Sequence, residues 1–239
     1  ALLLEGTMFG RTEEVVTTET DIEKEIAGLL QNTSGIVFIY TSGQNIDRLV
    51  SFYKAACRTN RLFVIDVYTA TILDGLKEFA ALPHPGGSFK NVKVFYPEWL
   101  CRRMIREGHA AILARYRDRE IKIEEITNKA DRIVMMTRAS MLKDIDQIAK
   151  LDGGALIYSM WGGYLQEKSM EPMLEWIRQR NLAFHSVHTS GHASISTLKK
   201  VVHTLKPQRI IPIHTFYPEQ YDALGANVEA VADGDFLTL

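Results

Sequence analysis

The residues of this sequence best suited to chemistry lie in one short turn, residues 188–194, with the sequence HTSGHAS. Its hydroxyl groups come from Thr189, Ser190 and Ser194. Gly191 has no side chain to block the approach of a ligand, and the first N–H groups of the helix expected to follow attract anions. His192, inside the turn, can donate a proton to a phosphate oxygen. We predict an anion-binding turn, and a simple helix cap with a surface histidine is the alternative.

Polar residues also follow other apolar runs directly. His214 closes the run at 209–213, and Glu5 follows the run at 2–4. In open α/β sheets, ligands bind at the carboxyl ends of the strands, so both residues are candidates for a site. A lone histidine at a strand end is also typical of a structural residue, and a lone carboxylate there is typical of a turn or helix cap. Weaker candidates for substrate contact are Ser42, Gly162 and Gly163.

These residues need a scaffold, and the hydrophobic pattern indicates its class. Short apolar runs alternate with amphipathic stretches, which predicts an α/β fold with a doubly wound, mostly parallel sheet and helices on both faces. We expect a capping box at 20–23 to open the first helix, Asp66 to cap a later one, and a hairpin around 233–234. The expected strands are 2–4, 36–40, 62–65, 92–95, 133–136, 155–159, 184–187 and 209–213. The expected helices are 20–30, 46–57, 70–80, 98–106, 141–149, 171–180 and 194–205.

Composition excludes several classes of protein. The 239 residues allow one large domain or two small ones, and 28 basic against 29 acidic residues exclude a globally basic nucleic-acid coat. No run of about 18 apolar residues is present, so we expect no membrane span. Two cysteines, Cys57 and Cys101, form no CxxC pair, which fits a reducing, cytoplasmic compartment. The arginines at 102–106 and 115–119 fit solvated helix faces better than phosphate-binding surfaces.

Three segments together resemble the β-CASP group of the metallo-β-lactamase superfamily, the group of ribonuclease J and of the endonuclease subunit of the polyadenylation machinery. Residues 3–7, LLEGT, resemble the acidic first motif of that group. Residues 190–193, SGHA, resemble the second motif, and residues 212–214, PIH, resemble the third. The order of the motifs and the large α/β insert between the first and the second agree with the group.

The resemblance implies a role for each residue. Glu5 would orient His192, which would assist the leaving oxygen of the scissile phosphate, and His214 would complete the zinc site. Backbone and hydroxyl donors around the substrate phosphate would come from Ser190, Ala193 and Ser194. The parent protein would be a hydrolase with two zinc ions that cleaves phosphodiester bonds, with RNA as the expected substrate.

The main metal motif of the superfamily, HxHxDH, is absent from this sequence. A zinc site needs at least three protein ligands, so we expect this chain alone to hold no stoichiometric zinc and to be inactive. Because the chain opens inside an apolar run, we expect a fragment whose missing N-terminal half supplies the other ligands. Residues 1–13 and 181–239 would be pieces of a metallo-β-lactamase-like αββα domain, and residues 14–180 a β-CASP-like domain.

Two other functions stay open. The chain could be a non-catalytic α/β module whose Ser, Thr and Gly turns bind a nucleotide or phosphate, or part of a non-nucleolytic hydrolase with the lactamase fold. An HxHxDH motif elsewhere in the protein would favour an enzyme, and its absence would favour the binding module. The expected partners are RNA or another phosphodiester substrate and the N-terminal half. A membrane partner is not expected, and a homodimer stays open.

Overall fold

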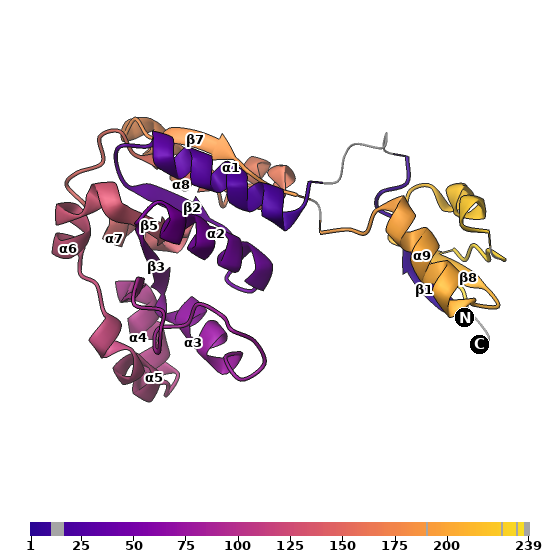
Figure 1. Ribbon diagram of the computed structural model, residues 1–239, viewed down its shortest axis with the longest axis horizontal. Coiled ribbons are helices and arrows are strands. Elements are labelled where there is room, and N and C mark those ends of the chain that lie inside the picture. The colour runs from indigo at the N-terminus through magenta and orange to yellow at the C-terminus, as the bar shows by residue number, and fades with distance from the viewer. Residues whose placement is uncertain (11–16, 190, 226, 233, 237–239) are drawn as a thin grey trace. The chain divides into compact units, whose positions relative to one another are not determined.

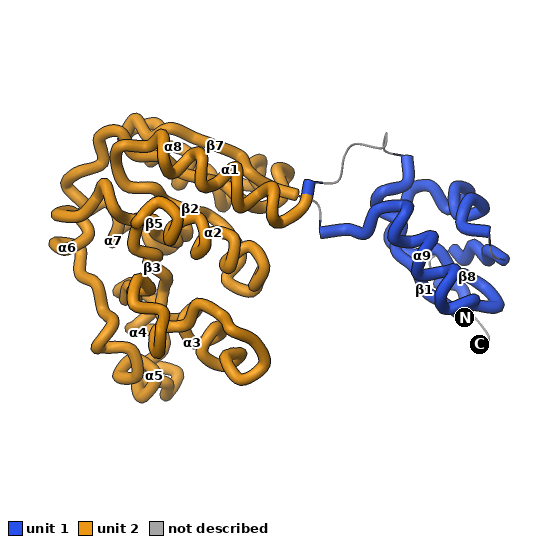
Figure 2. The backbone as a smooth tube through the Cα atoms, viewed as in Figure 1, with its two compact units in different colours: residues 1–17, 190–239 blue, residues 18–189 orange. Residues whose placement is uncertain are grey.

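The computed structural model describes residues 1–10, 17–189, 191–225, 227–232 and 234–236. The chain forms two compact units: unit 1 comprises residues 1–17 and 190–239, and unit 2 comprises residues 18–189 (Figure 2). The sequence predicts borders at 13/14 and 180/181. The second border lies later because strand β7 (Ala183–Ser186) pairs with a strand of unit 2. The assignment of the units to lactamase-like and β-CASP-like domains stays a prediction.

Unit 2 is built on a six-stranded parallel sheet with the strand order β4-β3-β5-β2-β6-β7 (Figure 1). Its strands are β2 (Val37–Tyr40), β3 (Leu62–Asp66), β4 (Val92–Phe95), β5 (Ile133–Met136), β6 (Ala155–Tyr158) and β7. Its helices are α1 (Glu19–Asn32), α2 (Ile46–Arg58), α3 (Val67–Gly75), α4 (Glu98–Arg106), α5 (Ala110–Arg115), α6 (Ile123–Asn128), α7 (Leu142–Ile145) and α8 (Glu171–Gln179). The predicted α/β fold with a parallel, doubly wound sheet is confirmed.

Strands β2, β5 and β6 in the middle of this sheet are buried on both faces, which explains why they are continuously apolar rather than alternating, whereas the edge strand β7 is largely exposed. Val37 and Ile39 of β2 pack with α1, α2 and α3 in one hydrophobic core. Phe38, which points to the opposite face, packs with α6, α7 and α8 in a second core. The cores hold the sheet rigid, so the residues at its carboxyl edge have fixed positions.

Several element boundaries differ from the prediction. Helix α1 is capped by Thr18, whose hydroxyl accepts from the Asp21 N–H while the Asp21 carboxylate accepts from the Thr18 N–H, so the capping box lies two residues earlier than expected. Asp66 caps α3 as predicted, through a bond from the Thr69 N–H. The expected tail hairpin includes Asp233, which lies outside the described residues. The described part of the tail forms the 3₁₀ helix η5 (Pro218–Leu224) and an isolated bridge rather than two strands.

Unit 1 contains a two-stranded parallel sheet of β1 (Leu2–Glu5) and β8 (Ile210–Ile213), with helix α9 (Ile195–Leu205) between them in sequence. Its buried core consists of Leu4, Phe9, Leu198, Val202, Ile210, Tyr221 and Leu224. The Tyr221 hydroxyl donates to the Leu4 carbonyl at 2.8 Å. The Tyr221 side chain lies so close to Gly6 that a side chain at that position would collide with it. No helix in the described part of either unit is long and apolar enough to cross a membrane.

Candidate functional site

The carboxyl ends of β1 and β8 bring two chemically useful residues together in unit 1. Glu5 is paired with Ile213 in the parallel ladder, and His214 comes directly after that pair. Glu5 and His214 therefore emerge at the same edge of the sheet, although they lie at opposite ends of the chain. This is the edge at which the sequence predicts a site.

His192 joins these two residues from the turn before α9. Ligand-type atoms of Glu5, His192 and His214 all lie within 4.8 Å of one another. His192 Nδ1 is 3.3 Å from Glu5 Oε2, and the ring centroids of His192 and His214 are 5.5 Å apart. The structure thus gathers the three residues that the sequence predicts as catalytic or metal-binding, and the roles of these residues stay a prediction.

The carboxylate of Glu5 is held by backbone donors on both oxygens. Oε2 accepts from the Thr7 N–H at 2.9 Å, and Oε1 accepts from the Ala193 N–H at 3.2 Å. Partial burial by itself raises the pKa of Glu5, but the hydrogen bonds from Thr7 and Ala193 and the nearby His192 outweigh it and lower the pKa below its ordinary value. Glu5 is therefore an ionised acceptor in a fixed orientation, suited to positioning an imidazole.

His214 has a left-handed backbone conformation, with φ of 49°, which is uncommon for any residue other than glycine. The Thr7 hydroxyl stabilises this turn through contacts with His214 Nδ1 at 3.2 Å and with the His214 carbonyl oxygen at 3.4 Å. Thr215 adds a bond from its hydroxyl to the Gly6 carbonyl at 3.1 Å. Residues held in such conformations cluster at functional sites, because the surrounding contacts must compensate for the strain.

The predicted anion-binding turn has other partners for several of its donors. The Ala193 N–H points to Glu5, and the Ser194 hydroxyl caps α9 by accepting from the Thr197 N–H at 3.2 Å. At Gly191, a side chain would meet open space, so packing does not demand glycine there. Ser190 lies outside the described residues. The contribution of this turn to phosphate binding stays a prediction.

The remaining predicted substrate-binding residues belong to unit 2. Thr189 is its last residue. Ser42 forms a turn before α2, where its hydroxyl accepts from the Gln44 N–H. Gly162 and Gly163 lie in the 3₁₀ helix η4 (Gly162–Gln166), with Gly163 against the Trp161 ring. Ser42 and Gly163 thus have local structural contacts, and substrate contact stays a prediction for all four residues.

The donor set fits part of a zinc site. Zinc binds imidazole nitrogen and carboxylate oxygen, and a catalytic zinc usually has three protein ligands. His192 and His214 offer two imidazoles, whereas both oxygens of Glu5 already accept backbone N–H groups. A carboxylate that orients a metal-site histidine is a common outer partner of such centres. The residues present therefore supply an incomplete ligand set with its orienting carboxylate.

Comparison with known proteins agrees with this geometry. Residues 178–223 match the RMMBL family, described as the Zn-dependent metallo-hydrolase RNA specificity domain. This match supports a relation to the metallo-β-lactamase superfamily. The matched stretch contains both His192 and His214.

A solved structure resembles the chain along almost its whole length. It is described as a protein of unknown function from Enterococcus faecalis V583, with a TM-score of 0.67 and 19% sequence identity. The match covers 98% of this chain and 50% of that one, so the chain spans about half the length of the structure it resembles. At this identity the likeness shows the fold alone. No curated protein matches the chain.

The site also depends on a residue that sequence reasoning did not single out. Thr7 contacts both Glu5, through its N–H, and His214, through its hydroxyl. The available signal was its place two residues after a strand-end carboxylate, where a threonine N–H can close a short turn on the acid. The local sequence could not indicate the second contact, because His214 comes from the far end of the chain.

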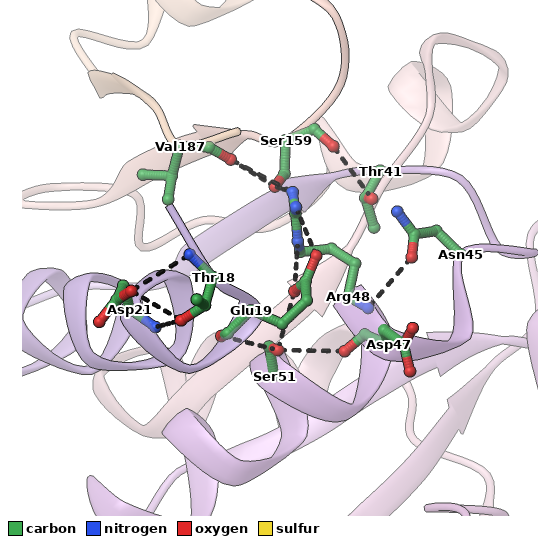
Figure 3. Close-up of polar contacts among 10 residues, drawn as sticks. All are labelled: Thr18, Glu19, Asp21, Thr41, Asn45, Asp47, Arg48, Ser51, Ser159 and Val187. Atoms are coloured by element: carbon green, nitrogen blue, oxygen red, sulfur yellow. Dashed lines mark hydrogen bonds and ion pairs between the residues drawn. The ribbon is translucent and has the colours of Figure 1, made fainter. Parts of the chain in front are cut away.

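Unit 2 contains a second polar cluster, around a fully buried arginine that no sequence motif marks (Figure 3). The Arg48 side chain is 1% exposed, and it donates to the Glu19 carboxylate, to the Ser159 hydroxyl and to the Val187 carbonyl. Burial raises the pKa of Glu19, but its bonds to Arg48 more than reverse this and lower the pKa. The cluster joins α1, α2 and the ends of β6 and β7, and its contacts are those of a structural brace.

Proposed function

We propose that this chain is part of a zinc-dependent phosphodiesterase of the β-CASP type that acts on RNA. The observation that carries the proposal is the convergence of Glu5, His192 and His214 within 4.8 Å. The match of residues 178–223 to an RNA specificity domain of zinc-dependent hydrolases supports both the metal and the substrate class. The resemblance of residues 3–7, 190–193 and 212–214 to the motifs of the β-CASP group supports the finer assignment.

The residues of this chain have distinct tasks in the proposed reaction. Glu5 holds His192 through its contact with Nδ1, so Nε2 is the ring nitrogen that can carry a proton to the leaving oxygen of a phosphodiester. His214 would be a zinc ligand, and Thr7 fixes its orientation. A bound zinc ion supplies Lewis-acid polarisation of a phosphoryl oxygen. The exposed side of His214 leaves room for substrate and for ligands from elsewhere.

The ligand count indicates that the complete centre needs residues beyond these 239. One imidazole ligand, that of His214, is fewer than the three protein ligands of a usual catalytic zinc, and about half of the similar solved structure has no counterpart in this chain. We therefore propose that further ligands come from another part of the protein. Unit 1 would then be a piece of the lactamase-like domain and unit 2 the β-CASP-like insert.

Metal analysis tests the ligand set on this chain. After rinsing with a chelator, the chain should retain less than one zinc per molecule, and added zinc should perturb the imidazole NMR signals of His192 and His214 together. His214→Ala should abolish that response, while His203→Ala on the exposed side of α9 should leave it intact. Tight stoichiometric zinc would contradict the proposed shortage of ligands. No response of either imidazole would contradict the metal site.

Catalysis is tested in a protein that contains this chain together with the remaining ligands. His192→Ala should slow the cleavage of a labelled single-stranded RNA by about 10²–10⁴-fold, the usual contribution of general acid–base catalysis. His203→Ala should cleave RNA at the original rate. Unchanged cleavage by the His192 variant would refute its role. Turnover of lactam or thioester substrates without RNA cleavage would indicate a non-nucleolytic hydrolase, and RNA binding without cleavage would indicate a binding module.

A further inference from the structure

Unit 2 has a pocket of about 400 Å³ at the carboxyl edge of its sheet, and neither the metal centre nor the Arg48 cluster includes it. Asp66, the last residue of β3, Pro97, just after β4, and Arg138, just after β5, all line this pocket. Ligands of open α/β sheets bind outside the carboxyl ends of the strands, and ligand pockets have volumes of roughly 300–1,000 Å³. The position and the size therefore both suit a small ligand or one segment of a larger one.

Two aromatic rings in the pocket are each paired with an arginine. The guanidinium carbon of Arg103 lies 5.6 Å from the Trp99 ring centroid, and that of Arg138 lies 5.7 Å from the Tyr68 centroid. Both distances are within the range of about 6 Å for cation–π attraction. Trp99 is 54% exposed and Tyr68 is 41% exposed, so each ring keeps open surface beside its arginine.

Arg138 is fixed in place before any ligand arrives. Its Nε donates to Asp66 Oδ2 at 2.9 Å, and its Nη2 donates to Thr69 Oγ1 at 3.1 Å. Asp66 is itself buried and anchored by the Thr69 N–H. Gly43 packs so closely that a side-chain carbon there would lie 2.9 Å from Arg138 Nη2. A guanidinium held in this way loses little conformational entropy when a ligand binds. The bonds to Asp66 and Thr69 use Nε and Nη2, so Nη1 can donate to a ligand.

The charge of the pocket favours an anion. Two guanidinium groups, those of Arg103 and Arg138, face one carboxylate, that of Asp66, which is already engaged. Arg103 also contacts Glu107, but both side chains of that pair are about half exposed, so the contact is weak and screened by solvent. Arg103 can therefore turn its remaining N–H groups to a ligand at small cost.

We infer that this pocket binds a nucleotide unit, with its base stacked on Trp99 or Tyr68 and its phosphate at Arg103 and Arg138. Inorganic phosphate would leave the two rings unused, and an acidic peptide would offer nothing flat to stack on them. Arginine groups interleaved with exposed aromatic rings are the usual means of holding single-stranded nucleic acid without reading its sequence. A free mononucleotide and a nucleotide within single-stranded RNA offer the same chemistry. The inference does not depend on the proposed metal centre or on its reaction.

The test is a set of titrations of the whole chain, with a chelator present so that the metal centre does not contribute. The ligands are adenosine 5′-monophosphate, a single-stranded hexaadenylate RNA, inorganic phosphate and a hexaglutamate peptide. The readout is the NMR signal of the Trp99 indole N–H, with the signals of Trp161 and Trp176 as internal references. We expect saturable shifts of the Trp99 signal with the mononucleotide, the RNA or both. Similar affinity for both would identify a free nucleotide as sufficient, and binding of the RNA alone would identify the strand.

Matched variants separate the pocket from general charge and general aromaticity. Arg103→Gln should weaken binding about tenfold, whereas Arg102→Gln, on the same helix but outside the pocket lining, should change it less than twofold. Trp99→Leu should weaken binding similarly when followed by the Tyr68 signals, and Trp161→Leu, another exposed tryptophan, should not. Both pocket variants alter exposed side chains, so they should fold normally. Equal losses for Arg102 and Arg103, preference for the peptide, or binding of phosphate as tight as that of the nucleotides would overturn the inference.

Discussion

Replacing Glu5 by Gln should loosen unit 1 by a defined amount. The carboxylate accepts one backbone N–H on each oxygen, from Thr7 and from Ala193, whereas the amide of Gln has one acceptor and one donor. One backbone N–H must therefore face another donor. A hydrogen bond to a charged group contributes about 1.5–3 kcal/mol, and because the Glu5 side chain is 28% exposed, water recovers part of it. We expect a loss of about 1–2 kcal/mol.

Hydrogen exchange measures this loss in the right place. Amides of the β1–β8 ladder should exchange about 5–30-fold faster in the variant. All three tryptophans, Trp99, Trp161 and Trp176, lie in unit 2, so denaturation followed by tryptophan fluorescence reports that unit and should be unchanged. This difference between the units is a control within the same molecule.

The pH dependence provides the sharper test. The pKa of Glu5 is lowered in the folded chain, so its stabilisation is complete above its ordinary pKa of 4.5 and is lost as pH falls through the lowered folded value. The gap between the original chain and Glu5→Gln should therefore be constant near neutral pH and close under acid. A gap that is absent at neutral pH, or one that persists in acid after Glu5 is protonated, would refute the argument that an ionised carboxylate organises the site.

Substitutions at three further positions probe the scaffold. Arg48→Met should destabilise unit 2 by about 2–3 kcal/mol in tryptophan-monitored denaturation. This is less than the roughly 3–5 kcal/mol for breaking a fully buried ion pair, because the Glu19 side chain is 35% exposed. Arg48→Lys should recover little of the lost stability, since three guanidinium nitrogens donate, and a cost of Arg48→Met under about 0.5 kcal/mol would contradict a structural role for the cluster. Tyr221→Phe should cost unit 1 about 1 kcal/mol by leaving the buried Leu4 carbonyl without its donor, and unaltered hydrogen exchange would exclude this contribution. Gly6→Ala should cost about 1–3 kcal/mol by collision with the Tyr221 ring, read from the same amides; exchange as slow as in the original chain would show that the ring can move aside.

Much of the fold could be predicted from local sequence. The run at 36–40 is continuously apolar because β2 lies between two cores, and a strand buried on both faces has no polar side to show. The helix cap at Asp66 could also be predicted from the sequence, since it depends on one carboxylate and an N–H three residues later. The start of the first helix could not be predicted to the residue, because Thr18 and Thr20 each begin a capping sequence and the structure uses Thr18.

The arginines at 102–106 show which features cannot be predicted from the local sequence. In the sequence they fit a solvated helix face, and Arg102 conforms to this, since it pairs with Glu98 on the same helix. Arg103 differs from its neighbour only by its direction, which places it in a pocket beside Trp99. Other residues that line the pocket, Asp66 and Arg138, lie at the ends of β3 and β5, so the sequence around α4 cannot show that Arg103 faces a pocket.

The order of residues along the chain is enough to specify the residue types of the candidate site and to place Glu5 and His214 at the carboxyl ends of their strands, because each comes at the end of an apolar run. It could not place His192, which follows β7 in sequence but lies beside β1 and β8. The folded chain is needed to see that Glu5 and His192 are 3.3 Å apart, that Thr7 connects Glu5 to His214, and that Arg48 is buried. Strand order and register are set by packing between segments far apart in the chain. Hydrogen bonds across such distances leave no periodic signal in the sequence.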